Sequence, residues 1–177
     1  VLELNCGTGE DALWLAQRGV RVTATDISTA MLSVTERKAR DCGLSGLIET
    51  RVLDLVAPFA LQAVKIDGAF SNFGGLNCVK DLRPLAAFLA DVIKPRGKLI
   101  LVPMNRGCVW EMVWHLLHFQ PRTAFRRLRR DGVEANVGHD TVHVWYPSIR
   151  MLRQVFAPYF QLKRVSGLGV CLPPSYL

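Results

Sequence analysis

"VLELNCGTGEDALWLAQRG", residues 1–19, is the stretch that decides the fold. Residues 1–4 have the character of a strand, a loop around Gly7 and Gly9 follows at once, and a helical pattern begins near Glu10. A tight strand-to-helix loop of small residues lets the backbone approach a ligand closely. The stretch therefore predicts a ligand-binding loop after the first strand of an α/β domain.

The residues around this loop indicate which ligand it suits. Dinucleotide-binding loops follow the pattern G-x-G-x-x-G, whose last glycine is replaced here by Glu10. An acid beside a helix N-terminus repels a pyrophosphate, so a nicotinamide cofactor is disfavoured. Asp26 ends the second predicted strand, where a carboxylate accepts hydrogen bonds from both hydroxyls of a ribose. Together they favour a nucleoside ligand; an ordinary tight turn and a capping acid are the alternatives.

Strands and helices alternate through the first half of the chain. After the opening strand, helices are predicted over 10–18, 28–42 and 81–94, and strands over 20–25, 48–53, 64–70 and 99–102. Such alternation is typical of βαβ units in a parallel sheet. We therefore predict an α/β, Rossmann-like fold, a mostly parallel twisted sheet with helices on both faces.

The alternation is lost after residue 103. The sequence predicts a helix in "CVWEMVWHLLHF" (108–119), a basic helical stretch in "PRTAFRRLRR" (121–130), a helix over 148–156 and a strand over 160–165. No linker marks a second domain. We therefore treat residues 1–177 as one domain with a ligand-binding core (1–103), a specificity insert (104–146) and a last helix and strand (147–177).

The composition indicates the class of protein and the cellular compartment that we expect. Half of the 177 residues are apolar, which is enough for a folded core. The five cysteines are an odd number without a C-x-x-C pair, so we expect reduced thiols in a cytoplasmic protein rather than a disulfide framework or a zinc site. No apolar run reaches the roughly 18 residues of a membrane span.

Five stretches, in this order, resemble the successive motifs of the class I S-adenosylmethionine-dependent methyltransferases: "VLELNCGTGEDALWLAQRG", "VTATDISTAML", "RVLDL", "DGAFSNFGGLN" and "DVIKPRGKLILV". They cover about residues 1–103. The resemblance implies the class I methyltransferase fold, S-adenosylmethionine as the cofactor and methyl transfer as the activity. Asn5 stands where the family has its first glycine, and asparagine tolerates a positive φ well, so we expect the loop geometry to survive.

The resemblance also implies which residues meet the cofactor. Residues 3–9 would lie near its methionine portion, 26–31 near the ribose and adenosine, 54–55 near the adenine, and 71–73 near the sulfonium. The predicted contacts are Glu3, Asn5, Cys6, Gly7, Thr8, Gly9, Asp26, Ile27, Met31, Asp54, Leu55, Ser71, Asn72 and Phe73. For Met31 a plain core position is the alternative, and for Asp54 a loop-capping role.

The insert (104–146) is where we expect the methyl acceptor to be recognised. Residues 105–131 hold six arginines and two acids, a net charge of +4, beside the apolar helix 108–119. This segment would cover an apolar acceptor pocket or contact an anionic membrane surface through 122–130; a core helix followed by a solvated one is the alternative. Nucleic acid is not expected, since no aromatic residues interleave with the arginines.

Catalytic candidates are few, because in-line methyl transfer depends mainly on proximity and desolvation. His143 and Tyr146, with His139, are candidate bases for a hydroxyl or acid acceptor. No metal is expected, since "SNF" and "MNR" stand where acidic magnesium ligands would follow the fourth and fifth strands.

We therefore predict methyl transfer to a small, apolar or amphipathic molecule. The alternatives are a cofactor-binding regulatory or partner-binding domain without turnover and, less favoured, a nicotinamide-dependent dehydrogenase. In the family a helix precedes the first strand and two more strands complete the sheet. This sequence starts within the first strand, so we expect incomplete ends and a partly uncovered cofactor.

Overall fold

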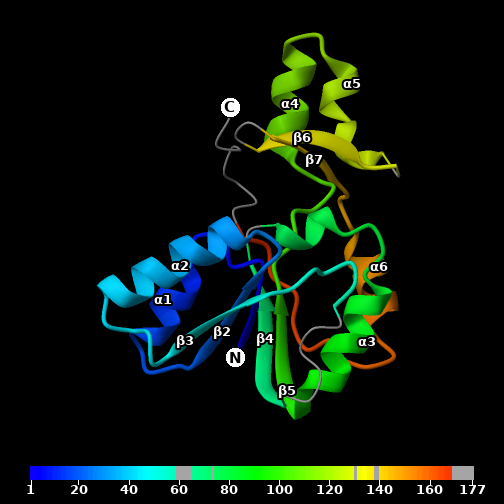
Figure 1. Cartoon of the computed structure of the whole chain (residues 1–177). Coiled ribbons are helices and arrows are strands. Elements are labelled where there is room, and N and C mark those ends of the chain that lie inside the picture. The colour runs from blue at the N-terminus through cyan, green and yellow to red at the C-terminus, as the bar shows by residue number, and fades with distance from the viewer. Residues whose placement is uncertain (59–64, 73, 130, 138–139, 169–177) are drawn as a thin grey trace. The chain divides into compact units, whose positions relative to one another are not determined.

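The computed structural model describes residues 1–58, 65–72, 74–129, 131–137 and 140–168. The chain divides into two compact units, Val1–Pro103 and Met104–Leu177. A parallel sheet organises the first unit and an antiparallel hairpin belongs to the second (Figure 1). Within the described part of the chain, no helix is long and apolar enough to cross a membrane.

A five-stranded sheet forms the centre of the first unit. Its strands are β1 (Leu2–Leu4), β2 (Val22–Asp26), β3 (Ile48–Val52), β4 (Ile66–Ser71) and β5 (Ile93–Leu101). They lie in the order β3-β2-β1-β4-β5, and every neighbouring pair is parallel. The predicted Rossmann-like α/β sheet is therefore confirmed.

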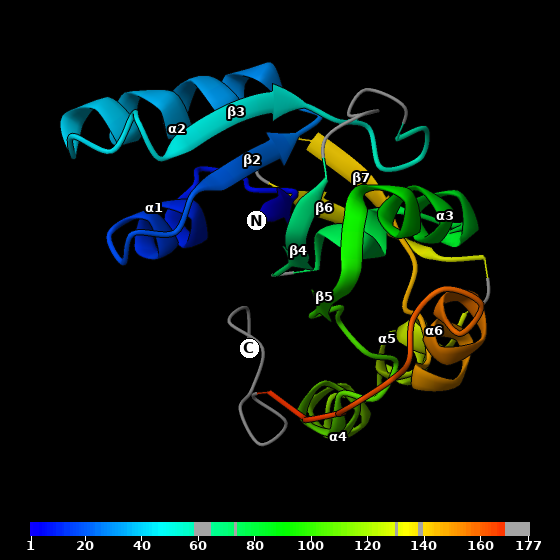
Figure 2. The same cartoon turned by 90° about the horizontal axis from the view of Figure 1, so that it is seen from below.

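Helices join these strands at the positions that the sequence predicted. They are α1 (Glu10–Ala16), α2 (Thr29–Asp41) and α3 (Arg83–Val92), with a short 3-10 helix, η1 (Gly75–Cys78), after β4. Ser28 begins α2 as the expected N-cap, since its Oγ accepts a hydrogen bond from the Met31 amide at 3.4 Å. Helices α1 and α2 cover one face of the sheet and α3 the other (Figures 1 and 2).

The side chains between α1, α2 and the sheet form one apolar cluster. Its buried members are Cys6, Ala12, Leu13, Ala16, Val22, Ala24, Leu32, Ala39 and Ile48. The cluster joins the loop after β1 to both helices, so the same packing that stabilises the unit fixes the base of the glycine loop.

Strand β5 contains the turn that "KPRGK" predicts. Ile93 pairs with Ile66 of β4, and the regular register resumes where Lys98 faces Gly68. Between them the strand bulges, and Arg96 has a φ of 68°. The turn is therefore a bulge within the strand rather than a connection that precedes it.

The second unit is built from short elements. They are α4 (Val109–Leu117), α5 (Pro121–Ala124), the 3-10 helix η2 (Arg126–Leu128), β6 (Val133–Val137), β7 (Asp140–Val144) and α6 (Ile149–Phe156). Strands β6 and β7 pair antiparallel, with Glu134 opposite His143. The helices predicted over 108–119 and 148–156 are confirmed, and Ser148 caps α6 through the Met151 amide at 3.2 Å.

The strand predicted over 160–165 is wrong. These residues have no regular secondary structure, and residues 161–165 are exposed. Their alternation of apolar and polar side chains suits a strand, but a strand forms only where a neighbour takes up its backbone hydrogen bonds. Lys163 and Gln161 instead bond each other through their side chains at 2.6 Å.

Candidate functional site

The glycine loop, Asp26 and Ser71 lie near the point where the strand order of the sheet reverses. The order reverses between β1 and β4, and Leu4 lies in register with both Thr25 of β2 and Ser71 of β4. In open α/β sheets, ligands bind beyond the carboxyl ends of the strands at such a switch point. The glycine loop, Asp26 and Ser71 therefore lie at the place where this fold receives a ligand.

Asn5 adopts the left-handed conformation that the loop needs, with a φ of 57°. The expectation that asparagine preserves the loop geometry is thus confirmed. Its side chain lies directly against Gly75, where an added Cβ would come within 2.4 Å of the Asn5 Cγ. The asparagine therefore depends on a glycine seventy residues later, a pairing that no local sequence pattern predicts.

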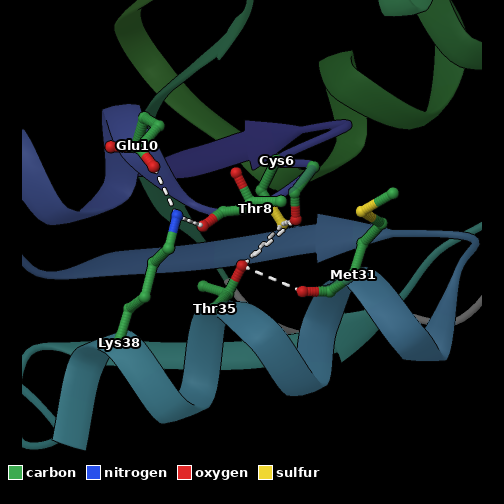
Figure 3. Close-up of polar contacts among 7 residues, drawn as sticks. Cys6, Thr8, Glu10, Met31, Thr35 and Lys38 are labelled. Atoms are coloured by element: carbon green, nitrogen blue, oxygen red, sulfur yellow. Dashed lines mark hydrogen bonds and ion pairs between the residues drawn. The ribbon is translucent and has the colours of Figure 1, made fainter. Parts of the chain in front are cut away.

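The glycine loop is fixed by hydrogen bonds on several sides, and Figure 3 shows those that join it to α2. Gly7 and Gly9 have φ values of 53° and 78°. The Gly7 amide donates to Asp26 Oδ2 at 3.0 Å, and the Gly9 amide donates to the Cys6 carbonyl at 2.9 Å. A Cβ on Gly9 would lie 2.5 Å from the Thr35 Cγ2, so the loop packs on α2 without room for a side chain there.

Asp26 is oriented by two backbone amides. Its Oδ1 accepts from Ser28 at 2.9 Å and its Oδ2 from Gly7 at 3.0 Å. A carboxylate has about four lone-pair sites, so each oxygen retains a site for a further donor. The capping role that was the alternative is therefore present, and the ligand-binding role stays a prediction.

Glu3 is a buried acid beneath the loop, only 3% exposed. Burial is the main cause that raises its pKa to about 8, and the carboxylates of Asp11 and Asp26 raise it further, while the Ala12 amide acts in the opposite direction. Among the described residues, neither the Oε2 of Glu3 nor the Oγ of Ser71 has a hydrogen-bond partner, although both are buried. A ligand that brings a cationic donor would satisfy this cluster, so the residues present fit the positively charged cofactor that the motifs imply.

The expected adenosine side of the site carries exposed apolar side chains. Ile27 is 62% and Met31 42% exposed, so the alternative of a plain core position for Met31 is wrong. Asp54 Oδ1 accepts the Val56 amide at 2.8 Å, so one of its oxygens does cap the loop. Leu55 is buried.

At the end of β4, Ser71 and Asn72 differ in their surroundings. Ser71 is buried, whereas the Asn72 side-chain amide donates to Asp11 Oδ2 at 2.9 Å and so links this strand end to α1. Phe73 lies outside the described residues.

The two candidate bases lie in the second unit and have structural partners there. The His143 ring nitrogen Nε2 lies 2.7 Å from the Asp131 carbonyl, and its ring stacks on Trp145. Tyr146 is buried with Val133 and Val144. His139 lies outside the described residues. A catalytic role for these residues stays a prediction.

A buried ion-pair cluster in the second unit was missed by the sequence reasoning. Glu111 of α4 is 1% exposed and bonds Arg126 Nε at 2.6 Å and Arg127 Nε at 2.7 Å. The Arg127 guanidinium also lies over the Tyr146 ring, and Arg106 donates to the Tyr146 carbonyl at 2.8 Å. An acid within an apolar helix that precedes an arginine-rich stretch was the available signal.

Comparison with known proteins settles the family. The sequence profile of the methyltransferase domain matches residues 1–97, more than half of the chain. This chain belongs to that family. The matched residues of the methyltransferase domain contain the glycine loop, β1 to β4 and the start of β5.

Curated relatives and solved structures agree with this assignment. The domain is 33% identical over 107 residues to an S-adenosyl-L-methionine-dependent Diels-Alderase of Talaromyces variabilis, covering 60% of this chain and 36% of that protein. It is 32% identical over 120 residues to a demethylmenaquinone methyltransferase of Thermobifida fusca, covering 63% and 50%. A SAM-dependent methyltransferase from Methanosarcina mazei has the same fold, with a TM-score of 0.66, 22% identity and coverage of 89% and 76%.

The chain thus spans between a third and a half of the length of these two curated relatives. The class I methyltransferase fold, the family and its cofactor, S-adenosylmethionine, are confirmed as the sequence motifs implied.

Proposed function

We propose that this methyltransferase domain binds S-adenosylmethionine at the switch point between β1 and β4 and transfers its methyl group to a small, apolar or amphipathic acceptor. The observation that carries the proposal is the cluster of acids around the glycine loop, in which buried Glu3 Oε2 and Ser71 Oγ have no partner among the described residues. A ligand with an ammonium and a sulfonium group suits such a cluster, whereas a pyrophosphate does not.

Different residues of the site recognise different parts of S-adenosylmethionine. Glu3 holds the ammonium group, and the oriented carboxylate of Asp26 accepts hydrogen bonds from the ribose hydroxyls. The exposed side chains of Ile27 and Met31 pack against the adenosine, beside Asp54. The bound cofactor supplies a methyl group activated by the positive sulfonium.

The methyl-transfer step depends mainly on how the acceptor is positioned relative to the methyl group. Methyl transfer to a neutral amine or an activated carbon needs an acceptor held in line with the methyl group and shielded from water. A base is required only where the acceptor must lose a proton first. His143 and Tyr146 remain candidates for that role.

The apolar character of the acceptor is supported by α4. Val109 and Leu117 of this helix are 64% and 72% exposed, and Trp110, Val113 and Trp114 are also largely exposed. Such a surface suits an acceptor with an apolar body.

We propose that only some of the arginines between residues 122 and 130 contact an anionic membrane surface. Arg126 and Arg127 share the single carboxylate of Glu111, so one of their two positive charges is balanced within the unit. The exposed side chains of Arg122 and Arg129 are left to make such a contact. We also propose a cytoplasmic location, in which the thiols of Cys6, Cys42, Cys78 and Cys108 would stay reduced.

Isothermal titration tests the cofactor. S-adenosylmethionine and its demethylated product S-adenosylhomocysteine should both bind, and NADH should not. Binding of NADH without binding of either S-adenosyl compound would overturn the proposal.

A second candidate function is cofactor binding without methyl transfer. It is favoured by the relative named as a Diels-Alderase, which depends on S-adenosyl-L-methionine. Incubation of the protein with S-adenosylmethionine labelled in its methyl group and a cell extract separates the two. Label in any small molecule supports methyl transfer, whereas cofactor binding without transfer favours the second candidate.

A further inference from the structure

Two side chains of α2 donate hydrogen bonds to backbone carbonyl groups of the glycine loop (Figure 3). The Thr35 hydroxyl donates to the Gly7 carbonyl at 3.2 Å. One helical turn further, Lys38 Nζ donates to the Thr8 carbonyl at 3.1 Å and forms an ion pair with Glu10. Two successive carbonyls of the loop are thus bound from the same helix.

Thr35 occupies the centre of this contact. Its side chain is completely buried, and its single hydroxyl hydrogen is shared between the Gly7 carbonyl and the Met31 carbonyl, each at 3.2 Å. The Cys6 Sγ lies 3.9 Å from the Thr35 Oγ1. Burial raises the pKa of the Cys6 thiol to about 12, so the thiol stays protonated, and its Sγ donates to the Gly7 carbonyl at 3.6 Å.

Gly7 is therefore held on both of its backbone groups. Its carbonyl accepts from Thr35, and its amide donates to Asp26 Oδ2. The carbonyl of Gly7 and the amide of Thr8 point in opposite directions across a trans peptide, so the same contact turns the Thr8 amide away from α2. Loss of the Thr35 hydroxyl would leave the Gly7 carbonyl with the weaker Cys6 thiol donor, so the Gly7 amide would hold Asp26 less firmly.

We propose that Thr35 is a positioning residue for the cofactor: its hydroxyl sets the glycine loop and, through Gly7, the carboxylate of Asp26. Thr35 does not touch the ligand itself. Gly9 also packs against the Thr35 side chain, which leaves no room for a Cβ at position 9. The inference rests on the proposed cofactor-binding function of the loop.

A pair of variants isolates the hydroxyl from the rest of the side chain. Thr35→Val keeps the branched shape and removes the donor, and Thr35→Ser keeps the donor and removes the methyl group. In isothermal titration with S-adenosylhomocysteine, we expect Thr35→Val to bind about tenfold more weakly than the wild type. Thr35→Ser should bind within about twofold of it. Equal binding by Thr35→Val, or equal weakening in both variants, would overturn the positioning role.

Hydrogen exchange of the protein without cofactor provides a second, independent measurement. A peptide that spans residues 5–9 should exchange faster in Thr35→Val than in Thr35→Ser, because Gly7 loses the donor to its carbonyl and its amide then leaves Asp26 more often. A distant peptide from α3 should exchange alike in both variants, which controls for global destabilisation. If the wild type bound no S-adenosyl compound, the proposed function would fail, and unchanged exchange at residues 5–9 would separately overturn the role of Thr35.

Discussion

Helices α3 and α4 are both apolar, but they use their side chains in opposite ways. Helix α3, in the first unit, buries Leu85, Ala86, Phe88, Leu89 and Val92. Helix α4, in the second unit, buries the acid Glu111 and leaves most of its large apolar side chains exposed. The first unit is thus organised by apolar packing under a preformed ligand loop. The second contains a buried ion pair and leaves the apolar side chains of α4 exposed.

The largest effect is expected from Gly9→Ala, which tests whether the first unit depends on a preformed loop. The φ of 78° and the contact with Thr35 oppose a Cβ. The strain should cost about 3–5 kcal/mol locally and reduce S-adenosylhomocysteine binding at least about a hundredfold. Gly46→Ala is the matched control, because no described neighbour lies within 4 Å of the place that its Cβ would take, and it should bind like the wild type.

The next largest effect is expected from Glu111→Ala, which tests the ion pair of the second unit. The change leaves Arg126 and Arg127 without their buried counter-charge. We expect a loss of about 3 kcal/mol, since one partner of a buried pair remains. Chemical unfolding followed by tryptophan fluorescence reports it, because Trp110, Trp114 and Trp145 all lie in this unit.

The control for Glu111→Ala is Asp81→Ala. Asp81 pairs with Arg83 on the surface, where the two side chains are 46% and 78% exposed. An exposed pair contributes at most about 1 kcal/mol. If both variants lost the same stability, the second unit would not depend on its buried ion pair.

Asp26→Ala tests the ligand-binding side of the first unit. Removal of a carboxylate that two amides orient should weaken cofactor binding by about 1–3 kcal/mol. Titration with S-adenosylhomocysteine measures the loss, with Glu49→Ala as an exposed acidic control. Unchanged affinity of Asp26→Ala would contradict the ribose-binding role.

Taken over one pH unit, the smallest effect is the pH dependence that Glu3 gives to the stability of the first unit. Its pKa is raised from 4.5 to about 8 in the folded protein, mainly by burial. The folded state therefore keeps a proton that the unfolded chain releases, so this contribution to stability is full below pH 4.5 and is lost as the pH rises through 8. The free energy of unfolding should fall with rising pH across this window, by at most about 1.4 kcal/mol per pH unit.

Glu3→Gln should flatten this slope, because glutamine does not titrate. Urea unfolding at several pH values between about 5 and 8 measures the slope for both proteins. Retention of the full wild-type slope in Glu3→Gln would assign the pH dependence to another group.

The same contrast explains how much could be predicted from the sequence. In the first unit, the alternation of strands and helices, the cap at Ser28 and the place of Asp26 are local patterns, and the structure has them. The fit of Asn5 against Gly75 and the contact of Thr35 with Gly7 join residues far apart in the chain. No periodicity or short motif encodes such contacts.

In the second unit, local patterns were less reliable. The helix 108–119 was predicted from its apolar character, yet the residue that it buries is Glu111. The alternation over 160–165 predicted a strand that does not form, because pairing depends on a neighbouring strand rather than on the segment itself. These failures have one cause: the second unit's arrangement depends on partners that are distant in sequence.

The buried thiol of Cys6 has a practical consequence. Thiolates, not thiols, react with alkylating reagents, so Cys6 should react slowly while exposed Cys42 reacts quickly. Since Cys6 adjoins the glycine loop, its slow labelling by a maleimide would time the opening of that loop. The labelling rate of Cys6 therefore reports how well the folded loop protects this thiol.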